Sequence, residues 1–282
     1  MSAPAPVHPL QCLEVWGDNS RVDEVVSVPG IDAWIRSIPF ADSDQGGDLH
    51  YVSMCGAGRI ARFALADVSG HGDVVGPVAV RLQDLMRKNI RTLDQTKMAR
   101  ALNTEFTALA EFGTFATALL MTYYAPTDHL IICNAGHPKP LWYSVDQGSW
   151  TLLDDQTEVC ATCVENVPLG VIDTTTYAQF AVPLDPGDIV VMYTDSLIEA
   201  RGADGEQLGE DGLLALVQDL GPVEVDSLTD RILLAVDGYR GGSLSDDDQT
   251  ILVLRHNAGD PPRQSIGDKL SVMAKMVGLK DT

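Results

Sequence analysis

The sequence contains few basic residues. Its 19 Lys and Arg stand against 40 Asp and Glu, which gives a formal net charge of −21 at pH 7. A surface of this sign repels phosphate backbones and anionic lipid head groups, so it argues against nucleic acid and membrane surfaces as partners. The composition is 45% hydrophobic and 21% charged, which is ordinary for a globular protein and excludes an acidic disordered tail. With 282 residues the chain can bury a large core.

Long hydrophobic runs are also absent. The longest, residues 115–125, has 11 residues and contains Thr117 and Thr122. A helix needs about 20 apolar residues to cross a bilayer, so this run is typical of a buried strand instead. Residues 1–10 carry no basic residue ahead of an apolar stretch, so a secretory signal is not expected. We therefore predict a cytoplasmic location without a membrane partner.

Cysteines are few and scattered, and their number, five, is odd. This pattern favours reduced thiols over a disulfide framework. Cys160 and Cys163 have CxxC spacing, but a zinc site needs two more ligands and the sequence has no second pair. A cysteine-based phosphatase is not indicated either, because no cysteine lies in a glycine-rich loop followed by arginine.

Segments of β-strand character alternate with pairs of helical segments. The expected strands are residues 33–39, 49–54, 59–68, 115–125, 129–133, 140–145, 177–182, 188–193 and 250–254. The expected helices, from apolar residues three or four apart, are residues 75–85, 98–109, 213–220 and 228–236. Residues 1–30 hold four prolines and are expected to be irregular. Consecutive strands and segregated helix pairs predict an α+β fold with antiparallel sheets.

Acidic residues stand at the ends of four predicted strands. Asp48 and the run Asp246-Asp247-Asp248 each precede a strand, Asp67 lies at the end of one, and Asp195 follows another. Taken singly, each is typical of a solvated surface. Strand ends can meet at one edge of a sheet, and carboxylates gathered there repel one another unless cations bind between them. Such hard oxygen ligands favour Mg²⁺ or Mn²⁺ over zinc.

Eight short motifs occur along the sequence, and their combination and order are specific although no single motif is. They are Gly46-Gly47-Asp48, Asp67-Val68-Ser69-Gly70-His71-Gly72, Phe115-Ala116-Thr117-Ala118, Asn134-Ala135-Gly136-His137-Pro138, Pro168-Leu169-Gly170, Gly187-Asp188 with Tyr193-Thr194-Asp195, Glu199-Ala200, and Asp247-Asp248-Gln249-Thr250. Together they resemble the metal-dependent protein phosphatases of the PPM (protein phosphatase 2C) superfamily, in its bacterial SpoIIE-type branch.

The resemblance implies two stacked antiparallel β-sheets flanked by helix pairs, which agrees with the expected element order. It also implies two Mn²⁺ or Mg²⁺ ions at one edge of the sandwich. Asp67 would bridge both ions, Asp195 and Asp247 would complete the shell of one, and Asp48 and the main-chain carbonyl of Val68 would serve the other. Asp67, Asp195 and Asp247 would then be catalytic, through a metal-activated water and without a protein nucleophile.

Three further residues are interpreted through the same resemblance. Asp248, the second acid of the closing motif, is expected to support the site or to lie on the surface. His71 does not stand at the position of the general acid of the wider superfamily, which corresponds here to Ser69. His137 stands where many relatives carry an aspartate for a third metal, so we expect it to be a hydrogen-bonded structural residue.

The resemblance covers residues 46–256, where we expect the phosphatase domain. Residues 1–45 would form a lead-in that partly joins the sheet, and residues 257–282 a linker with a short amphipathic helix. The implied substrate is a phosphorylated protein, by analogy an anti-sigma-factor antagonist, and a sensor or activator would be a separate protein. Two alternatives remain open: a catalytically silent binding module of this fold, and a hydrolase of small phosphate esters.

Overall fold

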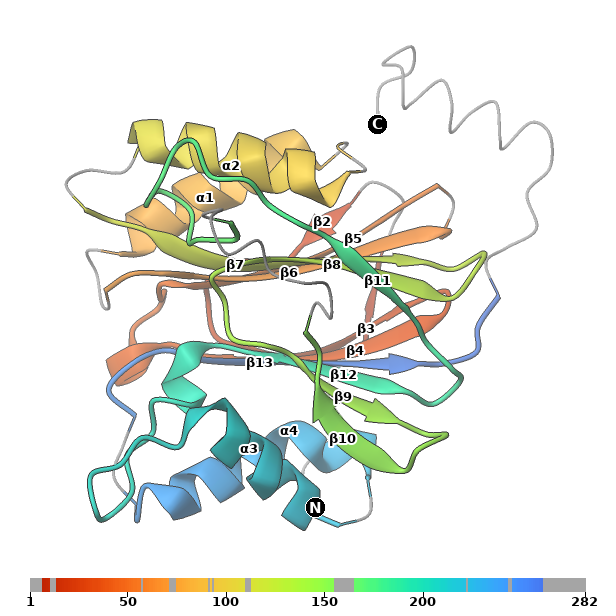
Figure 1. Ribbon diagram of the computed structural model, residues 1–282, viewed down its shortest axis with the longest axis vertical. Helices are drawn as coiled ribbons and strands as arrows, with labels where there is room; N and C mark the ends of the chain where they lie inside the picture. The colour runs from red at the N-terminus through yellow and green to blue at the C-terminus, as the bar shows by residue number, and fades with distance from the viewer. Residues whose placement is uncertain are drawn as a thin grey trace.

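The chain folds into four layers (Figure 1). The structure, a computed structural model, describes residues 7–10, 14–56, 58–70, 75–90, 92, 94–109, 113–154, 165–221, 223–242 and 245–260. Two β-sheets pack face to face at the centre, and a pair of α-helices covers the outer face of each. The predicted α+β class, with two stacked sheets flanked by helix pairs, is therefore confirmed.

Both sheets are built almost entirely from antiparallel neighbours. The seven-stranded sheet has the order β1 (Val7–Pro9), β3 (Val22–Val28), β4 (Ile31–Ile38), β13 (Gln249–His256), β12 (Ile189–Tyr193), β9 (Leu141–Ser144) and β10 (Ser149–Leu152). The six-stranded sheet has the order β11 (Phe180–Pro183), β8 (His129–Ala135), β7 (Ala116–Tyr124), β6 (Ile60–Val68), β5 (Asp48–Cys55) and β2 (Val15–Trp16). The pair β1–β3 is parallel.

The helices bury one apolar stripe each. Helices α1 (Gly76–Asn89) and α2 (Gln95–Leu109) pack on the six-stranded sheet, and α3 (Gly209–Asp219) and α4 (Val225–Tyr239) pack on the seven-stranded sheet. In α4, Leu228, Ile232 and Val236 recur at helical spacing and are buried. Each such side chain contributes about 1.5–3 kcal/mol by leaving water. Single 3₁₀ turns follow β4 and β12, namely η1 (Phe40–Asp42) and η2 (Asp195–Leu197).

The layer between the sheets changes character along the strands. Alternate residues point into this layer, and those at its centre are apolar and fully buried, including Phe63, Leu65, Leu119, Met192 and Leu252. At one end of the same strands the inward positions are polar: Ser37, Asp48, Asp67, Thr117, Thr194 and Thr250. The antiparallel order thus brings the predicted acidic strand ends to the end of an apolar core.

Some elements differ from the sequence-based expectation. Residues 22–28 form β3 instead of an irregular segment; only Val26 and Val28 of this strand are buried, so its apolar pattern is weak. Strand β10 was not expected, and the strand expected at 177–182 lies at Phe180–Pro183. The CxxC pair at 160 and 163, His71 and the expected tail helix lie outside the described residues. None of the helices in the described ranges combines the length and apolar character needed to span a membrane.

Candidate metal centre

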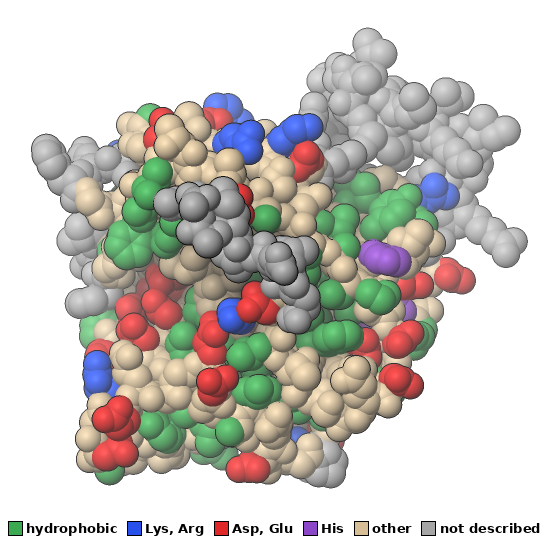
Figure 2. Space-filling view, viewed as in Figure 1, with side chains coloured by type: hydrophobic (Ala, Val, Ile, Leu, Met, Phe, Trp, Pro, Cys, Tyr) green, Lys and Arg blue, Asp and Glu red, His purple; other side chains and the backbone are tan. Residues whose placement is uncertain are grey.

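Four predicted ligands come from both sheets and meet at one end of the sandwich. Asp48 opens β5 and stands directly opposite Asp67 of β6 in the antiparallel ladder. Asp195 opens η2 immediately after β12, and Asp247 lies two residues before β13. Acidic side chains gather between the two helix layers at the left of Figure 2, the side where β7 and β13 begin in Figure 1.

Asp67 and Asp195 are partly buried carboxyl groups that lie near other carboxylates. Burial raises the pKa of the Asp67 carboxyl well above its usual range, and the charges of Asp195 and Asp247 raise it further. Burial, then the charge of Glu199 and then that of Asp247, raises the pKa of Asp195 to about 6. Like charges in a low-dielectric site disfavour ionisation. Among the described residues, no Lys, Arg or His forms an ion pair with Asp67 or Asp195.

Asp48 lies deepest of the four. Its side chain is buried, and burial followed by the charges of Asp67 and Asp248 raises its pKa well above the usual range. One of its oxygens, Oδ2, accepts a hydrogen bond from Thr194 Oγ1 at 2.8 Å. Thr250 also stabilises the ionised form of this carboxyl by hydrogen bonding and so lowers its pKa. Asp48 is therefore an anchored carboxylate and not part of a solvated surface.

Asp248 holds the loop that leads into Asp48. Its Oδ1 accepts the N–H of Phe40 at 2.6 Å and its Oδ2 accepts the N–H of Gly47 at 2.5 Å. A Cβ atom at Gly46 would lie 2.5 Å from Asp248 Oδ2, so the two glycines of the motif allow this close approach. Of the two expectations for Asp248, a surface position is wrong, because the side chain is buried, and support of the site stays a prediction.

The main chain of Val68 lies against the same loop. Val68 N donates to Gly47 O at 3.3 Å, and a Cβ atom at Gly47 would stand 2.9 Å from Val68 O. The carbonyl of Val68, which is predicted to be a ligand, therefore lies next to Gly47, the residue that precedes Asp48.

The donor chemistry fits a hard divalent cation, because carboxylate and carbonyl oxygens supply it and their mutual repulsion would be relieved by positive charge. Within the described residues, however, no three His, Cys, Asp or Glu side chains converge closely enough to form a ready-made ion site. The carboxylates lie within electrostatic reach of one another, and those of Asp67 and Asp195 are close enough for a hydrogen bond between them to affect the pKa of Asp195.

His137 lies beside the cluster and is hydrogen-bonded, as predicted. Its Nδ1 lies 2.8 Å from Thr117 Oγ1, and Thr117 stands opposite Asp67 in the β6–β7 ladder. The side chain of Asn134 accepts the His137 N–H and donates to the His137 carbonyl. Burial lowers the pKa of the imidazole to about 3, so the ring is uncharged at neutral pH.

Sequence reasoning missed three residues of the site. Thr194 and Thr250 hold Asp48 across the sheet interface, and Glu199 raises the pKa of Asp67 and Asp195. All three belong to recognised motifs but received no role there. A signal was available in the sequence: successive side chains of a strand point to opposite faces of the sheet, and this alternation places Thr194 and Thr250 on the face that packs against the other sheet.

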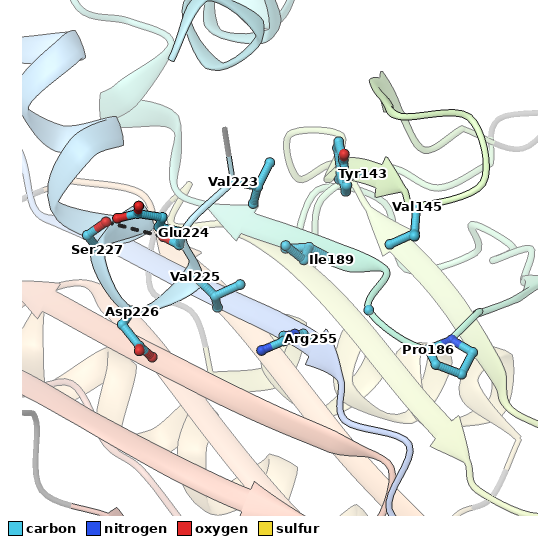
Figure 3. A pocket seen from close by; sticks show the side chains of 11 residues that line it. Tyr143, Val145, Pro186, Ile189, Val223, Glu224, Val225, Asp226, Ser227 and Arg255 are labelled. Atoms are coloured by element: carbon cyan, nitrogen blue, oxygen red, sulfur yellow. Dashed lines mark hydrogen bonds between the residues drawn. The ribbon is translucent and has the colours of Figure 1, made fainter. Parts of the chain in front are cut away.

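A separate cavity of about 740 Å³ does not coincide with this cluster. Tyr143, Ile189, Val225 and Arg255 are among its lining residues (Figure 3). Ile189 begins β12 whereas Asp195 follows its end, so the full length of the strand separates the cavity from the carboxylates.

Known proteins share this fold. The sequence profile of the family described as Stage II sporulation protein E (SpoIIE) matches residues 57–257. The RsbU and RsbW domains of Rv1364c from Mycobacterium tuberculosis superpose with a TM-score of 0.66 at 22% identity, over 92% of this chain and 71% of that chain. The PP2C phosphatase domain of SpoIIE from Bacillus subtilis, with a fragment of its regulatory domain, gives 0.66 at 14% identity, over 89% and 71%.

A third structure contains metal. The catalytic domain of the serine threonine protein phosphatase PstP, in complex with two manganese ions, superposes with a TM-score of 0.53 at 17% identity, over 80% of this chain and 97% of that chain. At these identities the superpositions establish the common fold, while the family profile spans well over half of the sequence. The chain belongs to the SpoIIE family and shares its fold with phosphatase domains of the protein phosphatase 2C type.

Proposed function

We propose that this protein is a Mn²⁺- or Mg²⁺-dependent phosphatase that hydrolyses phosphoserine or phosphothreonine in a bacterial signalling protein. The observation that carries this proposal is the meeting of Asp48, Asp67, Asp195 and Asp247 at one end of the sandwich, where burial and then the charges of neighbouring carboxylates raise the pKa of the first three. A cluster of mutually repelling carboxylates is stabilised by divalent cations, and such cations locally reverse the field of a protein of net charge −21. The phosphatase unit would span residues 46–256.

The positions of the carboxylates suggest their roles. Asp67 has Asp48 opposite it in the ladder and feels the charges of Asp195 and Asp247, which suits a ligand shared by two ions. Asp195 and Asp247 would hold one ion, and Asp48 with the Val68 carbonyl would hold the other. Bound divalent cations supply a coordinated water of lowered pKa and positive charge for the phosphate oxygens.

The proposed substrate is a phosphorylated protein in a partner-switching pathway, such as an anti-sigma-factor antagonist. Support comes from the matched structure that joins RsbU and RsbW domains in one chain. A sensor or activator that controls the activity would then be a separate protein.

Phosphate release from a phosphoserine peptide tests the proposal directly. The purified chain should release phosphate with Mn²⁺ and lose this activity with excess chelator, and the Asp195→Asn variant should be inactive in both. Rates on the peptide and on a small phosphate ester distinguish a protein phosphatase from a hydrolase of small esters. Full activity in the chelator, or in Asp195→Asn, would overturn the site assignment. Mn²⁺ binding without turnover, even on a phosphoprotein substrate, would favour the silent binding module.

A further inference from the structure

One threonine hydroxyl connects the two sheets at the carboxylate cluster. Thr194 follows β12 of the seven-stranded sheet, and its Oγ1 donates a hydrogen bond of 2.8 Å to Oδ2 of Asp48, which opens β5 of the six-stranded sheet. Thr194 is 0% exposed and Asp48 is 2% exposed, so water does not compete for this bond. A side chain of one sheet therefore holds a proposed metal ligand of the other.

A second contact determines the direction of this bond. Thr250 N donates to Thr194 Oγ1 at 3.0 Å, and Thr194 N donates in return to Thr250 O at 3.1 Å. An amide N–H can only donate, so the hydroxyl uses one lone pair toward Thr250. An ionised Asp48 can only accept, so the single proton of the hydroxyl is directed to that carboxylate. The Asp48 oxygen that Thr194 contacts is thus held as an acceptor, which is the state a cation ligand requires.

The hydroxyl is itself held by a row of residues across three strands. Ser37 of β4 stands directly opposite Thr250 of β13, and their hydroxyl oxygens lie 2.8 Å apart. Ser37 and Thr250 are buried as well. Strand pairing fixes the backbone of Ser37 and Thr250, and Thr250 in turn holds Thr194. The hydroxyl of Thr194 therefore cannot move with the Asp48 carboxylate if that carboxylate rotates.

We propose that Thr194 is a positioning residue, whose hydroxyl sets the orientation of Asp48 toward a divalent cation. The next residue in the chain, Asp195, is a proposed ligand of the other ion. Thr194 is therefore adjacent in sequence to a ligand of one ion and hydrogen-bonded to Asp48, a ligand of the other. This inference rests on the proposed function, because the cation is the one that the phosphatase would use.

Mn²⁺ titration calorimetry on the full chain, without any substrate, tests this role. Thr194→Val keeps the shape of the side chain and removes the proton donor, and it should weaken Mn²⁺ binding about 10–100-fold, as is usual for residues that orient ligands. Thr194→Ser keeps the donor and should bind Mn²⁺ within about threefold of the wild type. The matched control is Thr122→Val, which removes another buried threonine hydroxyl, one that contacts Gln95 and not the cluster.

A double-mutant cycle separates positioning of Asp48 from a general structural effect. In the Asp48→Asn background, Thr194→Val should weaken Mn²⁺ binding by no more than about twofold further. A folded Thr194→Val protein that binds Mn²⁺ as tightly as the wild type would overturn the inference, as would equal losses in both backgrounds. If Thr194→Val fails to fold, Thr194→Ala replaces it in the cycle. A wild-type chain that does not bind Mn²⁺ at all would instead overturn the proposed function, and the inference with it.

Discussion

Asp195 illustrates, at the scale of the single residue, how folding changes an ordinary carboxyl group. Its pKa is raised from 3.8 to about 6 by burial and by the charges of Glu199 and Asp247. In the absence of a cation, keeping this group ionised at pH 7.5 costs the folded state about 3 kcal/mol. The free energy of a bound cation would offset this cost.

Asp195→Asn should therefore stabilise the metal-free protein while abolishing phosphatase activity. The raised pKa means that the folded state binds the proton more tightly than the unfolded state, so this group lowers stability as the pH rises through 4 to 6. We expect the unfolding free energy of the variant to exceed that of the wild type by about 2 kcal/mol at pH 7.5 and by about 1 kcal/mol at pH 5. Urea denaturation in chelator measures this gain; a variant less stable than the wild type at both pH values contradicts the assigned repulsion.

His137→Gln should reduce the sensitivity of the protein to acid. The pKa of His137 is lowered to about 3, so the unfolded chain takes up a proton below pH 6.5 that the folded state does not, and stability is lost as the pH falls. This loss amounts to about 2 kcal/mol at pH 5 and should be missing in the variant. The difference between unfolding free energies at pH 7.5 and 5 measures it. A variant whose difference equals that of the wild type would contradict the role assigned to His137.

At the scale of the element, α2 is tied to a loop at the metal-centre end of the sheet. Asn103 is fully buried in this helix; its Oδ1 accepts Gly170 N at 2.8 Å and its Nδ2 donates to the carbonyl of Ile172 at 2.9 Å. The loop is in turn joined to β7, since Ala116 and Leu169 exchange two backbone hydrogen bonds. One side chain thus connects a helix to the strand that carries Thr117.

Asn103→Ala should lower the unfolding free energy by about 2–3 kcal/mol, because it leaves buried backbone groups of the loop without partners. Thermal or urea denaturation provides the measurement. Thr104→Ala, at an exposed position of the same helix, should change stability by less than about 0.5 kcal/mol. Equal effects of the two substitutions would show that the Asn103 contacts contribute little.

At the scale of the whole molecule, a bound cation would reverse the dependence of stability on pH that comes from the carboxylates but not the dependence that comes from the buried histidines. The pKa values of His50 and His137 are lowered to about 4 and 3, so both histidines reduce the unfolding free energy of the protein as the pH falls. They do so whether or not a metal ion is bound. The metal-free protein becomes more stable as its carboxylates take up protons. In a metal-loaded protein, protons would compete with the ion for the carboxylate oxygens.

The stabilisation by Mn²⁺ should therefore shrink as the pH falls. At 100 times its dissociation constant at pH 7.5, Mn²⁺ should raise the unfolding free energy by about 2.7 kcal/mol per ion. The same Mn²⁺ concentration at pH 5 should raise it much less. Melting temperatures in Mn²⁺ and in chelator, at both pH values, test this. A Mn²⁺ effect independent of pH would mean that the ion does not bind through carboxylates.

Much of the fold was predictable because its signals are local. Strands β5, β6 and β7 and all four helices lie where alternation or helical spacing placed them, since each buries a regular apolar face. Strand β3 was missed because two of its residues are acidic and only two are buried. The four-residue strand β10 is too short for alternation to be recognised, and its place depends on pairing with β9.

The candidate site divides in the same way. The sequence alone determined which carboxylates are the candidate ligands, because the identities of Asp48, Asp67, Asp195 and Asp247 and their positions near predicted strand ends can be read without coordinates. The tertiary structure decided which groups support them: the burial of Asp248 against Gly47, and the hydrogen bond from Thr194 to Asp48. These contacts join residues 201 and 146 positions apart, and their existence depends on how two sheets stack. Local patterns specify strands and helices, whereas the packing of sheet on sheet specifies which side chains meet.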